Sequence, residues 1–357
     1  MADTLEKTES LEKTMTSEAT FDGRPAILVT LKNTSGMSVT FMDIGATWLS
    51  CKVPVAGEER EVLLGVSTMA DFNRQASYMG VSVGRYANRI AKGQFEIDGN
   101  QYQVETNQAG NTLHGGPDGF NRKRWDISEQ TDDSVRFSHI SPDGDQGFPG
   151  EVKTSVIYKL TEDNRVSICY DAETDAPTPV NLTNHAYFNL LGTDTGNNCK
   201  EHIVEIDALH YLPTNEVGVP LGELESVEST SFDFRNPKAI ATDLLADEQQ
   251  KNAKGYDHSF LLNPKRDLAG AAAIVSLSDD SLKMKVYTTK PAIQLYTGNW
   301  LGGTPNRVGG EYPDYSGVAL ETQFLPDSPN HPEWPQASCV LRPGEKYSYT
   351  TDYQFEF

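Results

Sequence analysis

Long apolar runs are missing from this chain of 357 residues. No stretch reaches the length that a bilayer-crossing helix needs. The opening residues, MADTLEKTESLEKTMTSEAT, lack the apolar centre of an export signal. We therefore expect no membrane partner and a cytoplasmic location, unless an export signal has been removed from the chain.

Cysteine and metal-binding motifs are also scarce. The four cysteines are far apart and form no CxxC pair, which excludes a dense disulfide framework and the common zinc spacings. The seven histidines include no HxxxH or HxH pair, so a histidine metal site is the least favoured interpretation. We expect free thiols in a reducing compartment, and no metal ion.

Basic residues are also few relative to acidic ones. Lys and Arg number 30 against 51 Asp and Glu, which gives a formal net charge of -21. Such a surface repels the phosphates of nucleic acids and of anionic lipids, so we expect no nucleic-acid partner. An uncharged small molecule is not repelled, whereas a phosphorylated one would need a local basic pocket.

Helical periodicity is scarce too, and short alternating runs of β-branched and aromatic residues dominate instead. Residues 24–31 (RPAILVTL) and 38–44 (SVTFMDI) have the composition of strands. The runs on either side of Asp98-Gly99 predict a hairpin, because both turn positions favour positive φ. Only residues 238–251 resemble a helix, and a loop is an equal alternative there.

These patterns predict an all-β protein, a single large β-sandwich with few short helices. Gly and Pro are spread through the chain, and neither a linker nor a fixed-period repeat is visible. We place the domain at residues 17–357, after a polar, partly frayed N-terminal arm at residues 1–16. The chain gives no interface signal, and we expect a monomer or a small homo-oligomer.

Two glycine-containing segments carry candidate binding residues. GRYANRIAKGQF holds Asn88 and Arg89, and Arg offers a rigid fork of donors that suits several hydroxyls. Taken alone, this segment is better explained by a surface ion pair. NTLHGGPDGFNRKRW places His114 before two glycines, which would clear space for a ligand, although a structural histidine fits equally well.

The segment VNLTNHAYFNL has an unusual polar face. If it forms a strand, one face carries Asn181, Thr183, His185, Tyr187 and Asn189, and the opposite face is apolar. A polar face with aromatic surface suits a sugar-binding wall, in which Tyr187 offers a ring and His185 a proton. The less favoured alternative is a hydrogen-bonded polar layer between two sheets.

The segment SGVALETQFLPDSPNHPEWP places Glu321 in an otherwise apolar strand. Burying an unpaired carboxylate is costly, so Glu321 needs a partner, and a protonated histidine in a cleft is a natural one. A structural ion pair is the alternative. The segments GYDHSF and AIQLYTGNW add Asp257 and Gln294, which are common ligands of sugar hydroxyls and equally common in turns and caps.

Together these segments resemble the aldose 1-epimerase (galactose mutarotase) family. The resemblance begins near Ser17 and rests on the order NRIA-G-F, NTLHGG, NLTNHAYFNL, GYDH, YTGN and ALETQFLPDSPNHPEWP. It implies a supersandwich with an open cleft across one sheet, a free aldose as substrate, and no metal or organic cofactor. It also implies interconversion of the α and β anomers of hexoses such as glucose and galactose, by acid–base ring opening, rotation about C1–C2 and re-closure.

The resemblance also implies a role for each candidate. Glu321 would be the general base, His185 the general acid, and His114 a second active-site histidine near the ring oxygen. The positions that match sugar-binding residues are Asn88, Arg89, Tyr187, Asp257 and Gln294. We expect the resting pair to hold a carboxylate and an imidazolium, because each favours the charged form of the other. The pH profile should be bell-shaped and belong to the pair.

Three other functions compete with this one. A glycoside hydrolase needs two carboxyl groups beside the scissile bond, which Glu321 and Asp257 would supply, but it leaves two histidines unused. A non-catalytic sugar-binding module needs no acid–base pair. An epimerase of hexose 6-phosphates needs basic residues at the phosphate, which the acidic balance of the chain disfavours.

Overall fold

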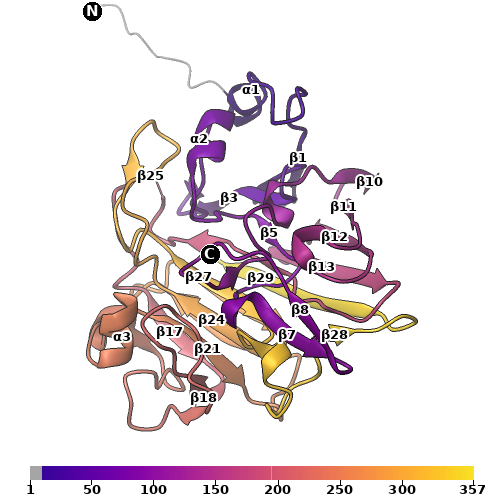
Figure 1. Cartoon of the computed structure of the whole chain (residues 1–357). Helices are drawn as coiled ribbons and strands as arrows, with labels where there is room; N and C mark the ends of the chain where they lie inside the picture. Colours follow the sequence, from indigo (N-terminus) through magenta and orange to yellow (C-terminus); the bar gives the residue numbers. More distant parts are fainter. Residues whose placement is uncertain (1–9, 194) are drawn as a thin grey trace, which may run out of the picture.

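Strands dominate the computed structural model of the chain, in which residues 10–193 and 195–357 are described (Figure 1). The largest sheet has nine strands, and its neighbouring strands are all antiparallel. Their order is β10 (Asp126–Gln130), β11 (Ser134–Ser141), β12 (Val152–Leu160), β13 (Arg165–Thr174), β29 (Tyr347–Glu356), β23 (Lys283–Thr288), β22 (Ala273–Ser276), β17 (Ile203–Ile206) and β20 (Lys238–Ala239).

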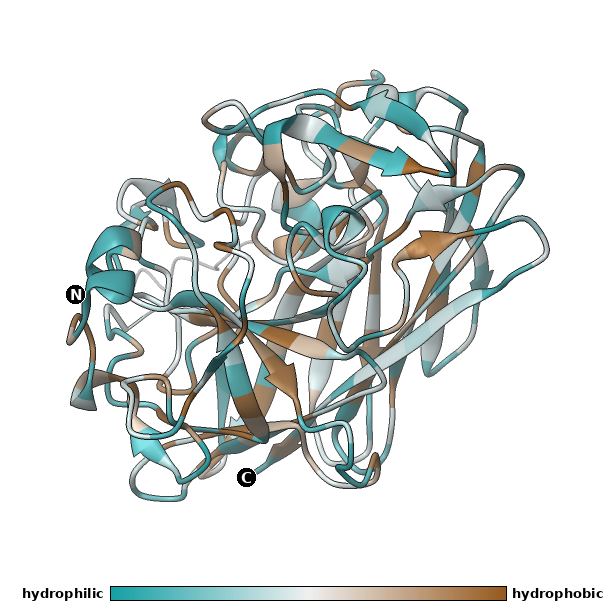
Figure 2. Ribbon diagram, turned by 60° about the horizontal axis from the view of Figure 1, so that its bottom comes forward, coloured by the Kyte–Doolittle hydropathy of each residue, from teal (hydrophilic) through white to brown (hydrophobic). Residues whose placement is uncertain are grey.

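A six-stranded antiparallel sheet packs on this large sheet. Its order is β16 (Tyr187–Phe188), β27 (Val318–Gln323), β24 (Ala292–Tyr296), β21 (Asp257–Leu262), β18 (Ala208–Leu212) and β19 (Glu225–Ser226). Tyr353 of β29 donates its hydroxyl to the carbonyl oxygen of Leu320 on β27 at 2.9 Å. The core between the sheets is apolar, and in Figure 2 the strands that cross the interior carry brown segments while peripheral turns are largely teal. The predicted all-β sandwich is therefore confirmed.

Smaller sheets complete the fold. A four-stranded sheet consists of β1 (Leu28–Lys32), β2 (Ser38–Met42), β3 (Thr47–Val55) and β4 (Glu58–Glu61). The two-stranded pairs are β5 (Ser82–Val83) with β15 (Thr183–Asn184), β6 (Arg89–Ile90) with β9 (Thr112–Leu113), β7 (Gln94–Ile97) with β8 (Asn100–Gln103), β14 (Thr178–Pro179) with β28 (Val340–Leu341), and β25 (Thr304–Pro305) with β26 (Glu311–Tyr312).

Local sequence signals explain several of these elements. The predicted hairpin is present, because Asp98 and Gly99 join β7 to β8 with φ of 52° and 80°. The segment 238–251 is divided: it begins in β20, passes through a 3-10 turn and ends in α3 (Glu248–Ala253). The side chain of Asp247 caps α3 by accepting from the backbone N–H of Gln250 at 3.0 Å.

Of the expected N-terminal arm, residues 1–9 lie outside the described residues. The rest holds α1 (Leu11–Met15), which Ser10 caps and whose Met15 side chain is buried. Helix α2 spans Met69–Arg74. Among the described residues, no helix combines the length and the apolar character needed to cross a membrane. One hydrophobic cluster extends from Val29 to Phe355, which supports our proposal that residues 17–357 fold as one unit.

Candidate active site

A pocket of about 190 Å³ brings the predicted residues together. Every candidate from the sequence except Gln294 lines it. The lining residues are Ala76, Ser77, Tyr78, Asn88, Arg89, Leu113, His114, His185, Tyr187, Asp257, Tyr296, Trp300 and Glu321. Two larger pockets, of about 300 and 450 Å³, contain none of the candidates. The pocket therefore combines titratable side chains with several aromatic rings.

Glu321 and His185 meet at the floor of this pocket. Glu321 lies in the middle of β27, and His185 lies just before β16, which pairs with β27 through Tyr187 and Ala319. The Nε2 atom of His185 is 3.4 Å from Oε1 of Glu321, and both side chains are almost fully buried. His185 Nδ1 and Glu321 Oε2 have no hydrogen-bond partner among the described residues. Buried polar atoms without a partner are rare in proteins, and two of them in one contact pair indicate a functional role.

Burial controls the charge of this pair. It raises the pKa of Glu321 well above 4.5, with the nearby Asp257 carboxylate as a second cause. It lowers the pKa of His185 to about 4. The expected resting carboxylate and imidazolium are thus corrected, because desolvation favours a carboxylic acid beside a neutral imidazole. Both arrangements contain the same proton and have no net charge, and they differ only in which residue holds that proton.

His114 is held in one tautomer by the backbone. The ring atom Nδ1 accepts a hydrogen bond from the backbone N–H of Asn88 at 3.1 Å. The backbone N–H of His114 donates to the carbonyl of Asn88 at 3.0 Å. Burial lowers the pKa of His114 well below 6.5, so the ring is neutral. With Nδ1 accepting, the proton of a neutral ring resides on Nε2. His114 is therefore a hydrogen-bond donor, and its ring lies edge-on to His185 at 5.2 Å.

This tautomer also bears on metal binding. His114, His185 and Glu321 each offer a ligand atom within 4.8 Å of the others, and two His with one Glu is a known zinc set. A metal needs an unprotonated nitrogen, whereas Nε2 of His114 carries the proton. These residues fit a metal poorly, and the absence of a metal stays a prediction.

The glycine after His114 serves the backbone and not a ligand. Gly115 has a φ of 89°, and a Cβ atom there would lie 2.0 Å from the carbonyl oxygen of Gly84. Only glycine permits this approach of two chain segments. The expectation that the glycine clears space for a ligand is wrong for Gly115, which instead allows the loop of His114 to dock beside the loop of Asn88.

The side chain of Arg89 is held by the side-chain amide of Gln108. Its Nε donates to Oε1 of Gln108 at 3.1 Å, and its backbone N–H donates to Oδ1 of Asn88 at 2.9 Å. Strand β6, which begins at Arg89, pairs with β9 just before His114. The ion pair considered for this segment is thus replaced by an amide contact at the pocket wall, and these hydrogen bonds hold Asn88 and Arg89 beside His114.

The segment VNLTNHAYFNL is two short strands and not one. Asn181 and Asn189 point away from the pocket: the amide of Asn181 donates to the carbonyl of Ala87, and that of Asn189 to the carbonyl of Ser316. Only His185 and Tyr187 of the expected polar face line the pocket. The sugar-wall hypothesis therefore stays a prediction for His185 and Tyr187 alone, and the hydrogen-bonded polar layer, the less favoured alternative, describes the two asparagines.

Gln294 lies behind the pocket lining. It is opposite Glu321 in the register of β24 and β27, and its amide donates to Oδ1 of Asp257 at 2.7 Å. Its own carbonyl accepts from the hydroxyl of Ser259 and, at 3.4 Å, from the amide of Gln323. The structure thus places Asp257 at the pocket and Gln294 where it orients the Asp257 carboxylate.

Sequence reasoning missed Tyr78. Its ring lies 4.6 Å from that of His114 and 6.0 Å from that of His185, between ring centroids. Its φ of 58° is a left-handed conformation that nothing in the stretch NRQASYMG signals. Tyr296 and Trp300 also line the pocket, and Tyr296 shares the face of β24 with Gln294, which alternation along a strand predicts.

Comparisons with known proteins show which proteins this chain is similar to. Residues 28–354 match the family model described as Aldose 1-epimerase. The aldose 1-epimerase of Escherichia coli (strain K12) is 52% identical over 335 residues, which cover 94% of this chain and 96% of that protein. The galactose mutarotase of Homo sapiens is 40% identical over 300 residues, covering 84% and 85%.

Solved structures give the same result. An aldose epimerase homologue from C. elegans superposes with a TM-score of 0.83 at 29% identity, covering 93% of this chain and 99% of that one. The galactose 1-epimerase from Lactobacillus acidophilus NCFM gives 0.80 at 30% identity, covering 94% and 96%. The resemblance found in the sequence is confirmed, and the chain belongs to the aldose 1-epimerase family.

Proposed function

We propose that Glu321 and His185 are the base and the acid with which this enzyme interconverts the α and β anomers of a free hexose. Anomer interconversion follows from the family, since the close relatives are aldose 1-epimerases and galactose mutarotases. The observation that carries the residue assignment is the 3.4 Å contact between His185 Nε2 and Glu321 Oε1 at the floor of a pocket.

Ring opening needs two proton transfers. The Glu321 carboxylate takes the proton of the C1 hydroxyl while protonated His185 gives a proton to the ring oxygen, and the bond between C1 and the ring oxygen breaks. The product is the open-chain aldehyde beside a carboxylic acid and a neutral imidazole. Rotation about C1–C2 turns the other face of the aldehyde to the C5 hydroxyl. Re-closure reverses both transfers, so the enzyme ends with the protons with which it began.

The electrostatics of the pocket favour this sequence. Desolvation favours the neutral pair, which is the form that accompanies the aldehyde. One proton shift between His185 and Glu321 converts that pair into the form that attacks the closed ring. Each of the two positioned groups contributes roughly 10²–10⁴-fold to the rate.

Neighbouring groups bind and orient the sugar. His114 donates its Nε2–H near the ring oxygen, Asn88 and Arg89 contact hydroxyls, and Asp257 accepts from hydroxyls with its orientation fixed by Gln294. The ring of Tyr187 is fixed because its hydroxyl donates to the carbonyl of Ser77 at 2.9 Å. Polar groups set in an aromatic wall suit a pyranose, which has both hydroxyls and apolar C–H faces.

The test is polarimetry of freshly dissolved α-D-glucose and α-D-galactose. We expect Glu321→Gln and His185→Asn each to lose at least about 100-fold in kcat, since each removes one proton-transfer group. Glu311→Gln is the matched control, because Glu311 is exposed and lies outside the pocket. Near-normal rates in Glu321→Gln, with the fold verified by circular dichroism, would remove this residue from the mechanism.

The remaining expectations belong to the same proposal. We propose a small free aldose as the only partner, with no cofactor, no nucleic acid and no membrane, and a cytoplasmic monomer or small homo-oligomer. A hydrolase would use Glu321 and Asp257 on a glycosidic bond, and release of nitrophenol from aryl glycosides would identify it.

A further inference from the structure

We propose that Gly218, in a loop distant in sequence from the pocket, is a positioning residue for Arg89. Its missing side chain leaves the space in which the guanidinium lies. The proposal rests on the sugar-binding role proposed for Arg89. It adds a determinant of that role from a loop, residues 213–222, that contributes nothing to the pocket lining.

The contact is direct and involves the functional end of the arginine. A Cβ atom on Gly218 would lie 2.4 Å from Cζ, 2.6 Å from Nη1 and 2.8 Å from Nε of Arg89. All three nearest atoms belong to the guanidinium, and no backbone atom is among them. Any side chain at position 218 therefore displaces the guanidinium and leaves the backbone of Arg89 in place.

The guanidinium is also held by a hydrogen bond. Its Nε donates to Oε1 of Gln108 at 3.1 Å. Gln108 thus orients the guanidinium in the space that Gly218 leaves open. Movement away from Gly218 breaks the hydrogen bond to Gln108 or moves the donors relative to the sugar, and a hydrogen bond weakens steeply when its distance and angle become unfavourable.

The loop that carries Gly218 is itself anchored. Gln249 of α3 accepts from the N–H of Thr214 at 2.8 Å and donates to its carbonyl at 2.9 Å. The same Gln249 oxygen lies 3.2 Å from Nε2 of His258 on β21, next to Asp257. His258 Nδ1 accepts from the backbone of Asp257 at 3.1 Å, so Nε2 carries the proton and donates. The loop therefore has a fixed position relative to the strand of Asp257.

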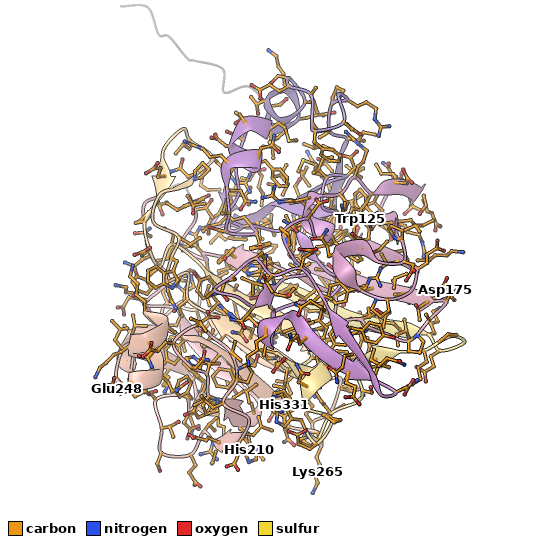
Figure 3. The ribbon with its side chains drawn as sticks, viewed as in Figure 1. Trp125, Asp175, His210, Glu248, Lys265 and His331 are labelled. Atoms are coloured by element: carbon orange, nitrogen blue, oxygen red, sulfur yellow. The ribbon has the colours of Figure 1, made fainter. Side chains whose placement is uncertain are left out.

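Internal hydrogen bonds also stiffen this loop. Oδ1 of Asn215 accepts from the N–H groups of Val217 and Val219 at 3.1 and 3.0 Å, on both sides of Gly218. Figure 3 labels one residue near each end of the loop, Glu248 and His331. Thr214 bonds to Gln249, which follows Glu248 in α3, and Gly222 lies near His331. These hydrogen bonds therefore fix the position of Gly218.

The chain offers a matched control for Gly218→Ala. Gly222 lies in the same loop with a φ of 114°, and its nearest neighbour to a new Cβ atom is His331, at 4.0 Å. Gly218 has a φ of 81°, so the control has at least as much backbone strain and no contact with Arg89. We expect Gly218→Ala to lower kcat/KM for mutarotation at least 10-fold, mainly through KM. Gly222→Ala should stay within about 3-fold, with similar melting temperatures for both.

A double-mutant cycle separates this proposal from the one on which it rests. Arg89→Ala should lower kcat/KM, and adding Gly218→Ala to it should have no further effect, because the displaced group is gone. Equal activity of Gly218→Ala and Gly222→Ala overturns the proposal, as does a loss that persists in the Arg89→Ala background. A fully active Arg89→Ala refutes the role of Arg89 itself, and the proposal with it.

A second variant covers a failure of Gly218→Ala to fold. Gly218→Asn carries the same Cβ atom on a residue that tolerates positive φ better than alanine does. It should show the same loss and the same dependence on Arg89, and full activity in this folded variant would overturn the proposal.

Discussion

His202 should make the stability of the protein fall as the medium becomes acidic. This histidine is fully buried, and its Nε2 accepts a hydrogen bond from the backbone N–H of Leu190 at 2.8 Å. Protonation would put an N–H on Nε2, opposite the N–H of Leu190, and would break that bond. Burial accordingly lowers the pKa of His202 from 6.5 to about 4.

The size of the effect follows from linkage. The unfolded chain takes up a proton below about pH 6.5, whereas the folded chain does not until about pH 4. Stability is therefore complete above the unfolded pKa and is lost as the pH falls through this window. His202 alone should cost about 2 kcal/mol by about pH 5, with a slope near 1.4 kcal/mol per pH unit. Burial lowers the pKa of three further histidines to about 4: the buried His185 and His258, and the half-buried His139.

The assay is urea unfolding, followed by circular dichroism, at several pH values between about 5 and 8. His202→Gln keeps an acceptor for Leu190 but does not titrate. On unfolding, this variant should therefore take up about one proton fewer than the wild type, and its unfolding free energy should change less steeply with pH. His210→Gln is the control, because His210 is exposed at the surface (Figure 3). Parallel curves for the wild type and His202→Gln would refute the reasoning.

Three further outcomes are expected. The kcat/KM for mutarotation should be bell-shaped in pH, with an acid limb near the histidine pKa of about 4, and a monotonic curve would contradict the paired mechanism. Gly115→Ala should destabilise the fold by several degrees in melting temperature, whereas Gly110→Ala, with positive φ but nothing within 4 Å of its new Cβ, should cost much less. Trp300→Ala should raise KM without lowering the melting temperature, because this ring lines the pocket at 63% exposure; Val308→Ala, exposed outside the pocket, should leave KM unchanged.

The residues that could be predicted from the sequence are those whose chemistry conflicts with their surroundings. Glu321 interrupts an apolar strand, and such a carboxylate needs a partner wherever the strand lies. Asp98-Gly99 determines its own turn through φ alone. Both inferences depend only on neighbours in the chain, and for this reason they can be made without knowledge of the tertiary structure.

The residues that escaped prediction depend on contacts between distant segments. Tyr78 reaches the histidines through a left-handed backbone, which its neighbours in sequence do not signal. Asn181 fits the alternation of a strand, yet its side chain bonds the backbone of Ala87 and Phe324. Alternation assigns faces only along a continuous strand, and here the strand is interrupted between Asn181 and Tyr187.

The position of β29 has a consequence for how the protein is made. This strand, residues 347–356, is inserted between β13 and β23 and pairs with both. While the ribosome is still synthesising the chain, β13 and β23 therefore each expose an unpaired edge, to which strands of other chains bind readily. Nascent chains that stall before residue 347 should depend on chaperones, whereas in chains that contain β29 both of these edges are paired.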